Sequence, residues 1–111
     1  MSARGDVTDV YRASDEVANE EWLRALDRAA ERLDLSGETR SRAADLFLST
    51  VPEGERSKRP ALAAAIYVAT LAAGDGRSQG EVADAVGVSR LSVQSRWKDL
   101  MAEAGLEPPS W

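Results

Sequence analysis

The feature that most constrains the fold is the almost wholly apolar run PALAAAIYVATLAA at positions 60–73. It falls short of the roughly 20 residues that a helix needs to span a bilayer. A helix that is apolar all round must be buried on most of its sides. We therefore predict a central helix here, with Ser57 as its N-cap, Pro60 in its first turn and GDGR closing it.

Four further helices are predicted around this centre. Ser14 is a candidate cap for the first helix, in which apolar residues from Trp22 to Leu33 recur at helical spacing. A second helix begins at Gly37 or Glu38, carries Val51 and is stopped by Pro52 and Gly54. The last two run over 79–86, capped by Ser78, and from a Ser89 cap to about Ala104. No stretch alternates with period two, so the fold class is all-α.

A chain of 111 residues is expected to form one domain. We assign residues 1–13 to a flexible N-terminal arm, 14–106 to the helical domain and 107–111 to a C-terminal tail. The N-terminus has no apolar core of a signal peptide, and no membrane segment is expected. We therefore expect a cytoplasmic protein.

The composition argues against several kinds of chemistry. The chain has no Cys and no His, so it offers neither disulfides nor the commonest zinc ligands and proton shuttle. It also has no nucleophile elbow, glycine-rich phosphate loop or metal-ligand cluster. We expect no cofactor, no metal, no catalytic residue and no enzymatic activity.

Residues 78–104 have the pattern of a helix-turn-helix. Ala83 permits close helix contact, Gly87 can adopt the positive φ of the turn, and Val88 and Val93 are expected to face the core. The second helix would then present the side chains Arg90, Leu91, Gln94, Ser95 and Lys98 away from it. Arg pairs with guanine, Gln with adenine, and Lys or Ser with phosphate. The alternative interpretation is an ordinary solvated helix face.

Charge is unevenly distributed along the chain. The formal net charge is -5, of which residues 1–37 contribute -4, while residues 38–106 hold nine charges of each sign. The densest basic cluster is Arg56, Lys58 and Arg59, which could contact a phosphate backbone. A solvated loop balanced by Glu53 and Glu55 is the alternative.

Three segments together resemble one cyclin-like repeat of the archaeal and eukaryotic transcription factor IIB family. LDRAAERLDLSGETRSRAADLF resembles its first two helices, RSKRPALAAAIYVA its central Ala-rich helix, and RSQGEVADAVGVSRLSVQSRWKDL its last two helices. The resemblance runs from about Glu20 to Leu106. It implies a five-helix cyclin-like fold whose last two helices form the helix-turn-helix.

The resemblance also implies partners, namely promoter DNA and the TATA-binding protein or other transcription machinery. It places Arg90, Ser92, Gln94 and Ser95 where the family's recognition helix faces the major groove. The sequence shows one repeat and no Cys for the family's zinc ribbon. We therefore expect a transcription regulator or accessory factor rather than a general initiation factor.

The predicted DNA-binding residues are Arg90, Ser92, Gln94, Ser95, Lys98, Arg56, Lys58 and Arg59. Because residues 38–106 carry no net charge, DNA binding is expected to be weak or to need a partner. The alternative is a cyclin-like protein–protein interaction module without direct DNA contact. The oligomeric state is left open.

Overall fold

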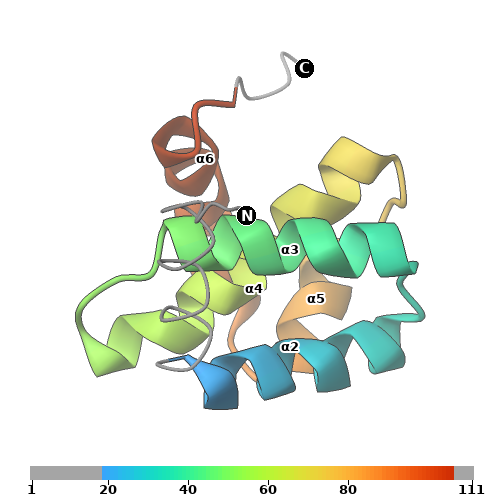
Figure 1. Cartoon of the computed structure of the whole chain (residues 1–111), viewed down its shortest axis with the longest axis horizontal. Coiled ribbons are helices and arrows are strands. Elements are labelled where there is room, and N and C mark those ends of the chain that lie inside the picture. Colours follow the sequence, from blue (N-terminus) through green and yellow to red (C-terminus); the bar gives the residue numbers. More distant parts are fainter. Residues whose placement is uncertain (1–18, 107–111) are drawn as a thin grey trace, which may run out of the picture.

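The computed structural model describes residues 19–106, which form five helices and no strand (Figure 1). They are α2 (Glu20–Leu33), α3 (Gly37–Ser49), α4 (Glu55–Ala73), α5 (Gln79–Val86) and α6 (Arg90–Glu103). The all-α prediction is confirmed. The predicted arm at 1–13, the Ser14 cap and the tail at 107–111 lie outside the described residues.

Helix α4 is the centre of the domain. All of its residues from Ala61 to Thr70 are buried, and it contacts each of the other four helices. Small alanine side chains let these neighbours approach closely on several sides. The buried hydroxyl of Thr70 donates a hydrogen bond to the Tyr67 carbonyl oxygen at 2.7 Å. The predicted central helix is confirmed.

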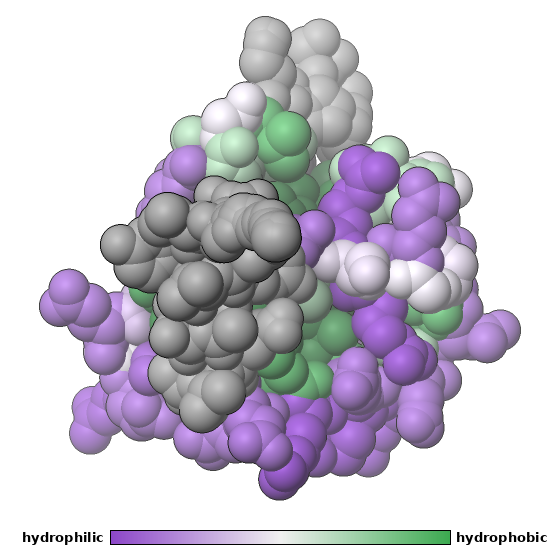
Figure 2. All heavy atoms as spheres, in the orientation of Figure 1, coloured by the Kyte–Doolittle hydropathy of each residue, from purple (hydrophilic) through white to green (hydrophobic). Residues whose placement is uncertain are grey.

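Helices α2 and α3 lie side by side and run in opposite directions (Figure 1). The buried stripe of α2 comprises Trp22, Ala25, Leu26, Ala29, Ala30 and Leu33. Its remaining residues are mostly charged and exposed, and Figure 2 shows hydrophilic residues along the lower edge of the view, over α2. The helical spacing of apolar residues therefore predicted most of this buried face, but Leu23, which belongs to the same apolar pattern, is only half-buried.

Serine side chains cap three of the helices. Ser36 accepts a hydrogen bond from the Thr39 amide at 3.1 Å, and Ser89 accepts one from the Ser92 amide at 3.2 Å. Ser78 and Glu81 form a reciprocal capping box at the start of α5. These bonds satisfy backbone donors that lack a partner within the helix, so α3, α5 and α6 begin where the sequence predicts.

Two predicted boundaries are wrong. Helix α4 begins at Glu55, with Gly54 at the N-cap and no side-chain cap, so Ser57 lies inside the first turn and Pro60 beyond it. Helix α3 ends at Ser49, which leaves Val51 in the following loop. The helix that carries Trp22 begins at Glu20, with Asn19 at its N-cap position.

Arg77, in the loop between α4 and α5, is hydrogen-bonded to the C-terminus of α2. Its Nε and Nη2 atoms donate to the Leu33 carbonyl oxygen at 3.0 and 2.8 Å, and Nη1 donates to the Asp75 carbonyl oxygen. These bonds pair carbonyl groups at a helix end, where acceptors are otherwise unsatisfied. These bonds hold the loop before α5 against the C-terminus of α2.

Within residues 19–106, no helix is both long and apolar enough to cross a membrane.

Candidate nucleic-acid interface

The candidate interface is built on α5, α6 and the tight turn between them. Val82, Ala83 and Val86 of α5 are buried, as is Val93 of α6. The amides of Gly87 and Val88 both donate to the Ala83 carbonyl oxygen, at 2.8 and 3.0 Å. Gly87 has a φ of 91°, a left-handed conformation that favours glycine. The two helices and the glycine turn therefore lie where the sequence predicts.

The core divides the polar residues of α6 into two rows. Val93, Trp97, Leu100 and Met101 are buried, and residues four apart on a helix lie on nearly the same side. On one side of the buried residues is the first row, made of Arg90, Gln94 and Lys98. On the other side is the second row, made of Ser92, Arg96, Asp99 and Glu103.

The first row is exposed and borders a shallow hollow of about 510 Å³. Arg90 and Gln94 line it together with Tyr67 of α4 and the start of α5. Lys98 lies over the Trp97 ring, with 5.6 Å from its Nζ atom to the ring centroid. The geometry thus brings together three of the predicted residues, whose guanidinium, amide and ammonium groups can all donate to bases or phosphates.

Two exposed residues complete the outer face of α6. Ser95 donates a hydrogen bond to the Ser92 carbonyl oxygen at 3.3 Å, and Leu91 is 73% exposed. Ser92 itself is half-buried, and its hydroxyl lies 3.1 Å from that of Ser89 in the N-terminal cap. The Ser92 hydroxyl therefore takes part in the N-terminal cap of α6, and Ser92 does not belong to the first row.

The basic cluster at 56–59 lies beside the second row, not the first. The Nη2 atom of Arg96 donates to the Ser57 hydroxyl at 3.2 Å, which joins α6 to the first turn of α4. Hence the eight predicted residues do not form one continuous patch.

Two of the three cations in this cluster have partners within the protein. Lys58 forms an ion pair with Glu55 at 3.4 Å. Arg59 donates from Nη1 to the Val86 carbonyl oxygen at 3.1 Å and lies over the Trp22 ring, 5.3 Å from its centroid. Arg56 is exposed and makes no such contact among the described residues. Arg59 therefore has a structural role in joining α4 to α2 and α5.

Carboxylates lie beside the second row of α6, on the same side as the basic cluster at 56–59. Asp99 and Glu103 share a cavity with Arg96, and Glu53 from the loop before α4 joins them. The two basic regions are thus separated by the core-facing side of α6 and flanked by acidic groups. Such an arrangement provides few phosphate contacts on any one surface.

The hollow beside the first row includes residues that sequence reasoning missed. Tyr67 is buried, and its ring packs edge-on against Trp97 with centroids 5.5 Å apart. The Oε1 atom of Gln79 is buried and has no hydrogen-bond partner in the described part of the chain. Neither residue carries a sequence signal, because both reach the hollow only through the packing of α4 and α5 against α6.

The pKa of one carboxyl group close to this site is shifted from its usual value. Hydrogen bonds from the backbone and side chain of Ser78, together with the charge of Arg77, hold the pKa of Glu81 below its usual value. Among residues 19–106, no cluster of three or more metal-ligating side chains is present.

Comparisons with known proteins match the segment of the chain that contains the five helices. The family model described as "Transcription factor TFIIB repeat" matches residues 18–103. A Transcription initiation factor IIB of Pyrococcus abyssi is 36% identical over 87 residues, which cover 76% of this chain and 29% of the relative. A protein of the same description from Pyrobaculum neutrophilum is 38% identical over 87 residues, covering 76% of this chain and 26% of that relative. The chain thus spans less than a third of the length of these relatives.

Proposed function

Because the chain belongs to the Transcription factor TFIIB repeat family, we propose that it acts in transcription as a regulator or accessory factor that contacts promoter DNA. The observation that carries this proposal is the first row of α6, in which Arg90, Gln94 and Lys98 are exposed along one side of the helix. The relatives are described as transcription initiation factors, which supports a role in transcription.

The chemistry of the first row suits a nucleic-acid groove. The Arg90 guanidinium can donate two hydrogen bonds to guanine, and the Gln94 amide can pair with adenine. Lys98 is placed to neutralise a phosphate. Ser95 lies beside this row, whereas Ser92 and Arg59 are occupied by contacts within the protein, so we propose no direct DNA contact for these two.

The surface charge favours weak binding by the repeat alone. Phosphate neutralisation supplies most non-specific affinity for DNA, and in the proposed contact regions of the described structure only Arg90, Lys98 and Arg56 are cations with neither an ion pair nor a hydrogen bond to the protein. We therefore propose that a protein already bound at the promoter, such as the TATA-binding protein, holds this repeat on DNA.

The test is binding to labelled promoter-like and random duplexes across a salt series, with and without the TATA-binding protein. Wild type is compared with Arg90→Ala and Gln94→Ala. Arg28→Ala is the matched control, because Arg28 is an exposed cation on α2, away from the first row. We expect each first-row variant to weaken sequence-selective binding about tenfold, the effect of losing roughly 1–3 kcal/mol of base discrimination. The control should bind like wild type.

Absence of binding at low salt, even with the TATA-binding protein present, would refute DNA contact. It would leave the second candidate, a protein–protein interaction module. The carboxylates beside Arg96 favour this candidate, since they break the positive surface that a DNA-binding face requires.

A further inference from the structure

A groove of about 450 Å³ lies between the loop that follows α3 and the C-terminal half of α6. Val51 and Pro52 of the loop line it together with Leu100 of α6 and Ala61 of α4. Leu100 and Ala61 are buried, whereas Val51 and Pro52 are half-buried. The groove thus has an apolar floor, and its size is in the range of sites that bind small ligands or single side chains.

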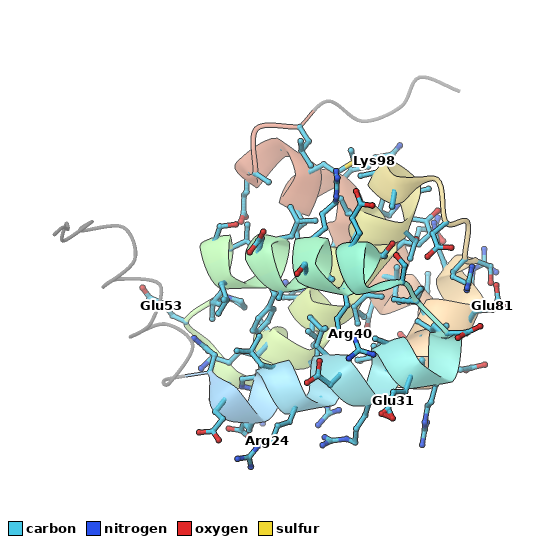
Figure 3. The ribbon with its side chains drawn as sticks, turned by 45° about the vertical axis from the view of Figure 1, so that its right-hand side comes forward. Arg24, Glu31, Arg40, Glu53, Glu81 and Lys98 are labelled. Atoms are coloured by element: carbon cyan, nitrogen blue, oxygen red, sulfur yellow. The ribbon has the colours of Figure 1, made fainter. Side chains whose placement is uncertain are left out.

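Carboxylates stand around this floor. Glu53, Asp99 and Glu103 are exposed lining residues, and none of them has an ion-pair partner within residues 19–106. Figure 3 shows Glu53 on the loop, away from the ribbon of the helices. Asp99 and Glu103 lie four residues apart on α6, so both project from the same side of the helix.

Arg96 is the single cation in the lining, and its Nη2 atom is hydrogen-bonded to Ser57, a residue outside the groove. Three carboxylates against one engaged guanidinium leave the groove with a net negative charge. Within this lining a cation is therefore favoured over an anion.

We propose that this groove binds a short basic segment of a protein partner. The aliphatic stem of an Arg or Lys side chain would lie on the floor formed by Val51, Pro52 and Leu100, and its charged head would lie among the carboxylates. This complementarity of apolar floor and acidic rim selects a basic peptide over an acidic or neutral one.

The groove is on the opposite side of α6 from the first row. A basic partner could therefore occupy it while the first row contacts DNA, and neither contact requires the other. The proposal goes beyond the proposed function and does not depend on it.

The experiment is a titration of the isotopically labelled full chain, followed by amide chemical shifts. The probe is the synthetic peptide Gly-Leu-Arg-Gly-Leu-Arg-Gly, and the control peptide carries Gln in place of both Arg residues. We expect saturable shifts of the amides of Val51, Glu53, Asp99 and Glu103 with the Arg peptide, and none with the Gln peptide.

Variants then test the carboxylates. Asp99→Asn combined with Glu103→Gln should weaken binding of the Arg peptide by about 3- to 10-fold, as expected for two exposed ion pairs. Glu31→Gln is the matched control, because it removes one negative charge from the exposed face of α2, and it should leave the affinity within about 2-fold. Circular dichroism confirms that each variant is folded.

Several results would overturn the proposal: equal binding of the two peptides, shifts confined to the first row, no saturable shift at about 1 mM peptide, or an equal loss in Glu31→Gln. DNA binding gives an independent readout. The double variant should retain the Arg90-dependent binding to duplexes, so failure of the groove and failure of the DNA contact are distinguishable.

Discussion

Glu81 is the carboxyl group whose ionisation is coupled to the start of α5. Its Oε1 atom accepts a hydrogen bond from the Ser78 amide at 2.9 Å, and its own amide donates to the Ser78 hydroxyl at 3.0 Å. Hydrogen bonds from the backbone and the side chain of Ser78 to the Glu81 carboxylate, and then the charge of Arg77, lower its pKa below the ordinary value. A lowered pKa means that the ionised form stabilises the folded state.

The stability that ionised Glu81 adds should be fully present above pH 4.5 and lost as the pH falls through the lowered pKa. We therefore expect Glu81→Gln, which keeps the capping geometry without the charge, to be less stable than wild type near pH 7. That difference should shrink toward about pH 3. Urea denaturation at both pH values measures it, and a difference that does not change with pH would contradict the coupling.

Arg56 and Arg59 lie three residues apart, but only Arg59 has contacts that stabilise the fold. Arg59→Ala removes the hydrogen bond to Val86 and the contact with the Trp22 ring, so it should lower the free energy of unfolding by about 1 kcal/mol. Arg56→Ala removes no contact of this kind and should change it by less than about 0.5 kcal/mol. Urea denaturation of the two variants compares them, and equal destabilisation would refute the structural role of Arg59.

The α5–α6 turn depends on the left-handed conformation of Gly87. Apart from Gly87 and its two chain neighbours, no residue has an atom within 4 Å of the position that a Cβ would take there, so the cost of Gly87→Ala is conformational. We expect a loss of about 1–2 kcal/mol in the free energy of unfolding. Thermal denaturation measures this loss.

Gly37→Ala is the matched control for the turn. This site at the start of α3 is equally open but has no positive φ. The substitution should be neutral or stabilise the protein by about 0.4–1 kcal/mol, because alanine restricts the unfolded chain. Equal destabilisation by the two substitutions would mean that the left-handed conformation of Gly87 is not the cause of the loss in stability.

Helix boundaries could be predicted wherever a single local interaction fixes them. Ser36, Ser78 and Ser89 accept hydrogen bonds from amides three residues further on, and a sequence displays that spacing directly. Helix α4 has no such side-chain cap, so Ser57 was mistaken for its start. The contacts of Arg59 could not be predicted either, because Trp22 and Val86 approach it only in the folded protein.

At the scale of the whole molecule, net charge is a sum that does not say where the individual charges lie. It predicted weak electrostatic attraction to DNA, but it could not show that the cations of α6 and of the 56–59 loop lie on different sides of the buried residues. That division follows from which side of α6 meets the core, and the sequence pattern alone does not place the basic cluster beside Arg96.

This division limits how strongly salt should affect any binding to DNA. With about three neutralised phosphates, the slope of log K against log salt should be about -3 or shallower. Lys98→Ala should make it shallower by about 1, while Arg28→Ala should leave it unchanged. Fluorescence anisotropy over a salt series measures the slope, and a value as steep as about -6 would mean a far more extensive basic surface than the one described.

The burial of α4 also determines which motions of the native protein can expose its amide groups to solvent. Exposure of the amides between Leu62 and Thr70 requires the surrounding helices to separate, since α4 contacts all four of them. Amide protons in this segment should therefore exchange with solvent only through complete unfolding, while those near the ends of α2 and α6 exchange through smaller openings. The slowest exchange rates in the domain would then report its global stability directly.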